Sequence, residues 1–248
     1  ILKSYMGKTK QQILRAFTAT PFRLACTATP SPNDHLELGN HCQFLGHMDS
    51  YEMIARWFQN DLMQAGKYTL KPHAAADFWR WVATWAVSIS KPSDIGGCDD
   101  GYDLPPLNVS KNVVQAPLDT SSTDSLYVDG NLSATALHKE KRRTCELRAD
   151  RAAEIVRAAS GPVIVWCDTD YEADALCKRL PEAVEVRGSM KDDAKKAGLA
   201  AFTTGQARVI VTKPEIAGFG LNWQHCSEVV FVGLSYSFER FYQAVRRS

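Results

Sequence analysis

Two short stretches decide the fold of this chain: residues 162–166, Pro-Val-Ile-Val-Trp, and residues 208–212, Arg-Val-Ile-Val-Thr. Both are continuous, mostly β-branched apolar runs, which are typical of strands buried on both faces of a parallel sheet. Segments with helical spacing of their apolar residues alternate with such runs. The pattern predicts an α/β domain with helices over 147–159, 170–180, 191–203 and 237–247 and strands over 162–166, 183–186, 208–212 and 228–232.

Toward the N-terminus the chain is expected to be mainly helical. Residues 9–17 have the pattern of a helix end, residues 22–27 that of a short strand leading into a Pro-rich turn, and a helix follows from about Asp34. Two aromatic-rich helices are expected next, one from Ser50 to near Gly66 and one over 78–89. Their apolar faces consist of Ile54, Trp57, Phe58 and Leu62 in the first and of Phe78, Trp81, Val82, Trp85 and Ile89 in the second.

The best candidate for a linker is the stretch from Lys91 to Pro106, which is rich in Asp, Gly and Pro. After it, alternation of apolar and polar residues over 107–114 predicts a strand, and the polar segment 119–146 is expected to be a loop that leads into a helix. A domain boundary is therefore expected between residues 91 and 106.

The composition bounds the function. A chain of 248 residues can form one large domain or two small ones, and its net charge of +1 means that any nucleic-acid contact must come from a local patch. The seven cysteines are odd in number and never spaced Cys-x-x-Cys, which favours a reduced, intracellular compartment. No apolar run reaches the length of a membrane span, and the first residues show no secretory signal. The chain opens on Ile1 and stops inside an expected helix, so we expect it to be part of a longer protein.

Three familiar ligand motifs fail on inspection. Gly7-Lys8-Thr9 has the tail of a P-loop, but the required first glycine would fall at Leu2. Gly218-Phe219-Gly220 lacks the third glycine of a dinucleotide fingerprint, where Trp223 stands. The sequence thus predicts no NAD site, and no metal site is predicted from His35, His41, Cys42 and His47, because their spacing does not place the histidines on one helix face.

The segments that follow the expected strands remain. Ligands of parallel sheets bind beyond the carboxyl ends of the strands, so these loops are the natural place for a site. In order and spacing, residues 27–33, 212–222 and 243–247 together resemble the later motifs of superfamily 2 helicases, closest to Swi/Snf-type translocases and phage DEAD/DEAH-like helicases. The resemblance implies a second RecA-like lobe over 107–248, truncated within the sixth motif, with the tail of a first RecA-like lobe over 1–46 and a helical, aromatic-rich insertion and linker over 47–106.

The turn after the first expected strand resembles the family's third motif. Thr27, Ala28, Thr29 and Asn33 match it, and the resemblance implies that they couple nucleotide state to the grip on nucleic acid. Short hydroxyl side chains suit such a role because they exchange hydrogen-bond partners at small cost. An ordinary strand, turn and helix with Thr and Asn caps explains the same residues.

The loop after the strand 208–212 resembles the fifth motif. Gly218 and Gly220 would let backbone N–H groups approach a phosphate of ATP, and Thr212 and Lys213 would donate to a nucleic-acid backbone. Asn222 is expected to hold the loop by bonding to its backbone and to lie along the nucleic acid. A glycine-rich crossover that needs positive φ is the alternative.

The last helix resembles the sixth motif, Gln-x-x-x-Arg. Gln243 and Arg247 match it as catalytic residues, with Arg247 as an arginine finger and Arg246 beside it at the ATP. Such a finger stabilises charge on a transferring phosphoryl group and contributes roughly 10³–10⁵ in rate. The alternative is a basic helix end that complements its own dipole. The residues expected to face inward are Phe238, Phe241, Tyr242 and Val245.

One further region and one further residue also match the second lobe, although neither match is specific. The region 163–171 corresponds to the fourth motif, and Arg187 lies along the nucleic-acid track of the family, so a phosphate contact is expected there. Trp223 is expected in the core, with base stacking as the lesser alternative.

Together these matches imply an ATP-dependent DNA helicase or translocase whose ATP and Mg²⁺ are held by a first lobe with a P-loop, acting on duplex DNA in the cytoplasm, or in the host cytoplasm for a phage protein. No P-loop or Asp-Glu magnesium motif occurs in the sequence, so this chain alone is expected not to hydrolyse ATP. A non-catalytic RecA-like nucleic-acid-binding module is the competing hypothesis, and an interaction domain built on the aromatic helices is a third.

Overall fold

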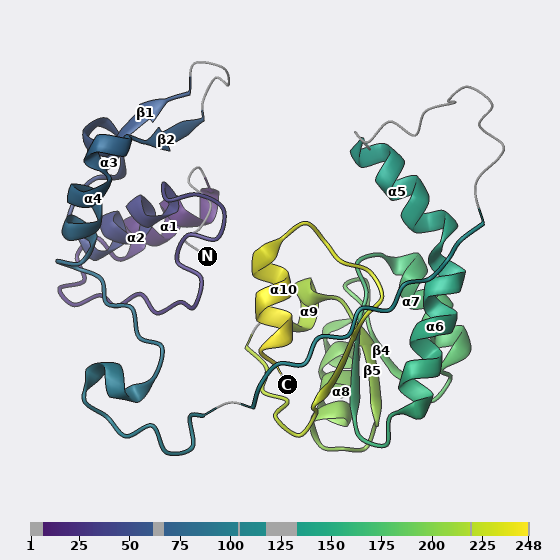
Figure 1. Cartoon of the computed structure of the whole chain (residues 1–248). Coiled ribbons are helices and arrows are strands. Elements are labelled where there is room, and N and C mark those ends of the chain that lie inside the picture. Colours follow the sequence, from purple (N-terminus) through teal and green to yellow (C-terminus); the bar gives the residue numbers. More distant parts are fainter. Residues whose placement is uncertain (1–6, 62–66, 104, 118–132, 219, 248) are drawn as a thin grey trace. The chain divides into compact units, whose positions relative to one another are not determined.

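The computed structural model describes residues 7–61, 67–103, 105–117, 133–218 and 220–247. The chain divides into two compact units, Ile1–Asn108 and Val109–Ser248, close to the linker expected from Lys91 to Pro106. Each unit is described by itself (Figure 1). None of the helices in the described ranges has the length and apolar character of a bilayer-spanning segment.

The second unit is built on a parallel sheet of four strands in the order β4-β5-β3-β6. Its central pairs align Val163 with Val209 and with Glu228. The strands are β3 (Val163–Trp166), β4 (Val184–Val186), β5 (Val209–Thr212) and β6 (Glu228–Phe231). The helices are α5 (Ala134–Arg143), α6 (Cys145–Ala158), α7 (Asp170–Arg179), α8 (Asp192–Thr203), α9 (Pro214–Ala217) and α10 (Phe238–Val245).

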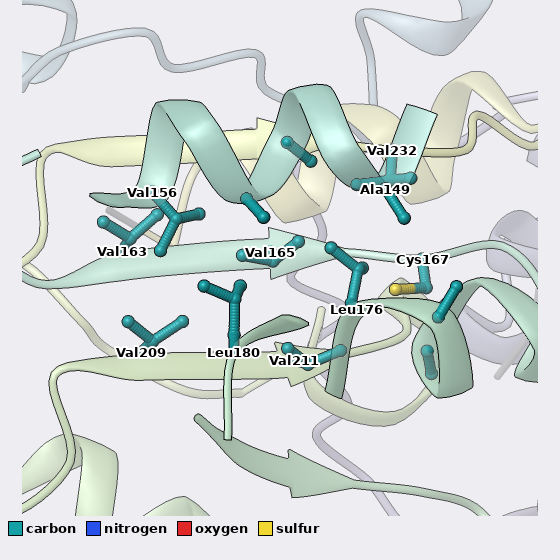
Figure 2. Packing of buried hydrophobic residues seen from close by; sticks show 14 of the residues in the cluster. Ala149, Val156, Val163, Val165, Cys167, Leu176, Leu180, Val209, Val211 and Val232 are labelled. Atoms are coloured by element: carbon teal, nitrogen blue, oxygen red, sulfur yellow. The ribbon is translucent and has the colours of Figure 1, made fainter. Parts of the chain in front are cut away.

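The helices cover both faces of this sheet, which explains why the central strands β3 and β5 are fully buried and almost wholly apolar. Val163 and Val165 point to one face, where α6 and α7 pack on them, as Figure 2 shows. Ile164 and Trp166 point to the other face, where they meet α8, α9 and α10. The predicted α/β fold is confirmed: a parallel sheet flanked by helices, consistent with a RecA-like lobe. Trp223 is fully buried on the second face, and its indole N–H donates to the Thr203 hydroxyl at 2.9 Å, so the expected core role is confirmed.

The first unit contains α1 (Lys8–Ala16), α2 (Glu37–Leu45), α3 (Ser50–Trp57) and α4 (Ala75–Val82). It also contains the antiparallel strands β1 (Phe58–Asn60) and β2 (Tyr68–Leu70) and two short 3-10 helices, Pro72–Ala74 and Pro92–Ile95. An aromatic cluster forms the core. Phe78 is fully buried and contacts Trp57, Phe58 and Trp81, with ring centroids 5.8, 5.5 and 5.8 Å away.

Both aromatic helices are shorter than predicted. The first ends at Trp57 because Phe58 enters a hairpin, where it lies opposite Leu70; Leu62 and Gly66 lie outside the described residues. The second ends at Val82, after which the N–H of Trp85 bonds back only three residues. Ile89 is exposed and does not belong to an apolar helix face.

Two predicted strands are absent from the described part of the chain. Residues 22–27 pair with no described strand, and Phe22 and Leu24 are 91% and 82% exposed. Residues 107–114 likewise pair with no described strand, and Val109 and Val113 are exposed. Apolar alternation alone does not make a strand, because the backbone also needs a partner for its hydrogen bonds.

The segment expected as a loop over 119–146 contains α5. Ser133 caps this helix, since its hydroxyl accepts from the N–H of Ala136 at 3.2 Å. The prediction of a loop is wrong for 134–143, and residues 118–132 lie outside the described ranges.

Candidate functional site at the carboxyl edge of the sheet

A shallow pocket opens at the carboxyl ends of three strands in the second unit. It is formed by the loops after β3, β5 and β6 together with α10, and of the residues predicted for the site it contains Lys213. Its lining mixes cations, carboxylates and aromatic rings. The lining residues are Cys167, Asp168, Lys213, Pro214, Glu215, Phe231, Gly233, Leu234, Ser235, Arg240 and Phe241.

Lys213 lies in this pocket and Thr212 does not. The Lys213 ammonium lies 2.9 Å from the Asp170 carboxylate in the first turn of α7, and this contact lowers the pKa of Asp170. Lys213 is a flexible cation whose partner is largely exposed, so a phosphate can compete for it. The Thr212 hydroxyl is buried and donates to the carbonyl of Val186 at 2.9 Å, which ties β5 to β4.

The loop after β5 owes its shape to its glycines and to Asn222. Gly220 has a φ of +74°, which favours glycine. A Cβ on Gly218 would lie 2.3 Å from the carbonyl oxygen of Pro214, the same oxygen that accepts the Gly218 N–H at 2.9 Å. The Asn222 side-chain oxygen accepts from the N–H of Gln224 at 3.4 Å, the local bond that the sequence predicted. Phe219 lies outside the described residues.

Arg247 joins this loop to α10. Its Nε and Nη2 donate to the backbone and side-chain oxygens of Gln243 at 3.1 and 2.8 Å, and its Nη1 donates to the carbonyl of Leu221 at 2.8 Å. In return the N–H of Trp223 donates to the carbonyl of Arg247 at 2.8 Å. Arg246 is exposed, with its guanidinium 4.3 Å from the ring centre of Tyr242. The structure thus brings the expected fifth and sixth motifs into direct contact.

The buried face of α10 differs from the prediction. Ala244 and Gln243 are buried, whereas Phe238 is 64% exposed. Phe241 lines the pocket, with its ring tilted by 46° against that of Phe231 and the ring centres 5.1 Å apart. The spacing of apolar residues correctly predicted the helix but not which of its faces is buried. The small Ala244 packs against the sheet, and the aromatic rings Phe238 and Phe241 remain partly exposed.

An ion pair between Arg148 and buried Glu172, which was not predicted from the sequence, fixes the loops after β3 and β6. Glu172 is fully buried, and its carboxylate accepts from Arg148 at 2.6 Å and from the N–H groups of Asp168 and Thr169 at 2.9 and 3.1 Å. Arg148 also donates to the carbonyl of Val232. A Cβ on Gly233 would lie 2.4 Å from Glu172 Oε2, so only glycine fits there.

Lys141 at the end of α5 makes a second link to the same edge. Its ammonium lies 2.8 Å from the Asp168 carboxylate and 2.6 Å from the carbonyl of Leu234. The carbonyl of Lys141 accepts from Arg148 at 2.5 Å, so the two links support each other. The cluster of four cations among residues 139–143 was the feature of the sequence that could have indicated a role for this segment.

Arg187 lies near the end of β4 in an acidic setting. Its guanidinium pairs with Glu185 and Asp174, and both contacts raise its pKa. A phosphate at Arg187 therefore has to compete with two carboxylates.

The residues expected as the coupling motif lie in the first unit. Thr29 is buried, and its N–H donates to the Thr27 hydroxyl at 3.1 Å, while Ala28 is exposed between them. Asn33 donates from its side chain to Glu37 at 2.9 Å, and this carboxylate also accepts the Asn33 N–H at 3.3 Å. The turn is thereby attached to the start of α2. This local arrangement is compatible with a coupling motif and equally with an ordinary turn before a helix.

The histidines considered as ligands have structural contacts. His41 Nε2 lies 3.1 Å from the carbonyl oxygen of Pro30, His35 packs edge-on against Trp79, and His47 stacks on Trp85. Within the described ranges, no group of three or more His, Cys, Asp or Glu side chains is arranged to hold a metal ion.

Comparison with known protein families gives a match that lies within the second unit. Residues 148–248 match the family model of the helicase conserved C-terminal domain. The match begins at Arg148 and contains the whole sheet and the carboxyl edge. The search of curated proteins finds no match to the chain. The second unit therefore carries a helicase-type C-terminal domain on a RecA-like fold.

Proposed function

We propose that this chain is the C-terminal portion of an ATP-dependent nucleic-acid helicase or translocase, related to Swi/Snf-type and phage DEAD/DEAH-like motors and acting on duplex DNA in the cytoplasm. Its second unit would supply nucleic-acid contacts and an arginine finger to ATP held by another lobe. The observation that carries the proposal is the contact between Arg247 and the loop after β5, both within the residues that match the helicase conserved C-terminal domain.

The finger role requires Arg247 to change partners. Its described donors bond to Gln243 and Leu221, a neutral amide and two carbonyls, so no carboxylate has to be displaced. A γ-phosphate carries more negative charge than these acceptors and forms stronger, charge-assisted bonds with a guanidinium. ATP binding would draw Arg247 away from Leu221 and release the loop, which is how nucleotide state would reach Lys213 and the glycines.

The carboxylates at the edge do not fit a magnesium site. Asp170 is paired with Lys213, and Glu215 with Arg240, so each already has a cation. The cations fit phosphate better, and bound ATP with Mg²⁺ would supply the phosphoanhydride whose hydrolysis drives movement. We assign the P-loop and magnesium ligands to another part of the first lobe, because neither motif occurs in this sequence.

The first unit supports the same assignment. Residues 22–27 have the composition of a strand, and two of their apolar side chains are exposed where a sheet would cover them. We propose that residues 1–46 complete the first RecA-like lobe, with Thr27, Ala28, Thr29 and Asn33 as its coupling motif. Residues 47–106 then form an accessory helical insertion around the aromatic cluster and a linker.

The test is ATP hydrolysis by the complete protein, with and without DNA. Arg247→Ala is expected to lower kcat by about 10³ or more while DNA binding is retained. Arg157→Ala is a matched control, because Arg157 lies at the end of α6 away from the carboxyl edge. Activity of Arg247→Ala near that of the unmodified protein would remove the finger assignment.

The second candidate is a RecA-like module that binds nucleic acid without hydrolysis. The observation that favours this module is that Arg247 already donates to Leu221 and Gln243, which gives this arginine a structural role. A complete protein that binds DNA and shows no DNA-stimulated ATPase activity would support the module.

A further inference from the structure

The end of α5 concentrates positive charge in a chain of nearly zero net charge. Lys139, Lys141, Arg142 and Arg143 stand against one carboxylate, Glu140, within five residues. These residues precede the segment that matches the helicase C-terminal domain, which begins at Arg148. The basic segment thus lies outside the matched residues.

This segment is attached to the carboxyl edge. Lys141 bonds to Asp168 after β3 and to the carbonyl of Leu234 after β6, and both residues line the pocket. Arg148 secures the corner between α5 and α6 through the carbonyl of Lys141 and the buried Glu172. In Figure 1, α5 continues from the N-terminal end of α6 on the side where these loops lie.

Two of the cations at this corner face solvent. Lys139 and Arg142 are exposed, and within the described ranges neither forms an ion pair with a carboxylate. The guanidinium of Arg142 lies 5.7 Å from the ring centre of Tyr171, and His138 packs against the same ring at 6.1 Å. The ring limits the freedom of Arg142, so less entropy is lost when it binds a planar or multivalent anion.

An exposed aromatic ring extends this surface toward the pocket. Tyr236 is 79% exposed, and Lys141 lies 5.5 Å from its ring centre. Alternating cations and rings along one edge suit the sugar-phosphate backbone and unpaired bases of a nucleic acid. An acidic protein surface would match the cations but has no need of the exposed rings.

We propose that Lys139 and Arg142 form a phosphate-binding surface that extends the nucleic-acid track of the carboxyl edge onto α5. The proposal rests on the proposed function and adds an element that lies outside the helicase-type domain. Lys141 and Arg148 act as positioning residues that keep α5 on the edge loops.

The experiment measures binding of this 248-residue chain to a fluorescent 20-nucleotide DNA, single-stranded and duplex, over a range of salt concentrations. The double variant Lys139→Ala/Arg142→Ala is expected to bind roughly ten- to a hundredfold more weakly at low salt. The slope of log K against log[salt] should fall by about 1.4–1.8, because each lost phosphate contact contributes about 0.7–0.9. Arg142→Lys keeps the charge and should retain most of that slope.

The control is Lys178→Ala/Arg157→Ala, which removes the same charge from exposed positions at the other ends of α6 and α7. Its affinity and slope should match those of the unmodified chain. If the α5 variant and this control behave alike while the unmodified chain binds DNA, the α5 proposal is overturned and the proposed function stands. If the unmodified chain binds neither DNA, both are overturned.

Discussion

The guanidinium of Arg247 donates to the carbonyl of Leu221 at 2.8 Å, which joins the last helix of the chain to the glycine-containing loop after β5. The reciprocal bond from Trp223 to the carbonyl of Arg247 closes a small ring of contacts between the two segments. A change at either segment is therefore felt by the other.

Gln243 is the acceptor that orients Arg247, so Gln243→Ala should lower stability. The variant loses the 2.8 Å bond to the guanidinium, and hydrogen bonds to charged groups contribute about 1.5–3 kcal/mol. Urea unfolding followed by circular dichroism measures the loss. Gln243→Glu keeps an acceptor and should be much less affected; equal losses in both variants would mean that the bond to Arg247 does not stabilise α10.

Gly233→Ala should be among the most harmful small substitutions in the second unit. Its Cβ would approach both carboxylate oxygens of buried Glu172, at 2.4 and 2.5 Å. Displacing Glu172 strains its pair with Arg148, and disruption of a buried pair costs about 3–5 kcal/mol. Gly161→Ala, where a Cβ meets nothing within 4 Å, is the matched control and should change stability by less than about 0.5 kcal/mol. Thermal unfolding of both variants provides the comparison.

Lys213→Ala should raise the pKa of Asp170, because the ammonium of Lys213 is the main cause of its lowered value. A depressed carboxyl pKa stabilises the fold above the unfolded value of about 3.9 and stops doing so as the pH falls through the folded value. The stability difference between the variant and the unmodified chain should thus shrink at low pH. NMR titration of the Asp170 carboxyl measures the shift directly, and an unchanged titration would show that the pair does not persist in solution.

The cysteines should differ sharply in their rates of alkylation. Cys26 and Cys98 are exposed, whereas burial raises the pKa of Cys177 to about 12 and that of Cys42 to about 11. At pH 8 a thiol with a pKa near 12 is about 10⁻⁴ thiolate, and the thiolate is the reactive form. Mass spectrometry after brief treatment with iodoacetamide should find Cys26 and Cys98 modified first. Early modification of Cys177 would contradict the burial of that thiol.

Phe78→Ala should destabilise the first unit by about 3–5 kcal/mol, the usual cost of removing a buried Phe side chain. Phe78 is fully buried among four aromatic rings, and one of these, the neighbouring Trp79, is 45% exposed. Hydrogen exchange of the amides in α3 and α4 reports this unit separately from the second. Trp79→Ala should alter that exchange far less, and similar effects of both substitutions would argue against the aromatic core.

Sequence alone was sufficient to predict the parallel sheet and four of the helices that pack on it, α6, α7, α8 and α10, but not the short α9. Runs such as 163–166 are apolar because both faces of their sheet are covered, so the run itself carries the information. The meeting of the loops after β3, β5 and β6 at one edge followed from the same fact, since parallel strands end on one side.

Only the tertiary structure decided which partners these elements have. Residues 22–27 have the composition of a strand, yet they pair with no strand within the described ranges. The helix α3 ends before Phe58 because Phe58 pairs with Leu70 in an antiparallel hairpin. The pair of Arg148 with Glu172, the attachment of α5 through Lys141, and the inward turn of Ala244 all join residues distant along the chain. Periodicity reports which face of an element is apolar, but not what covers that face, because burial depends on contacts that the local sequence does not contain.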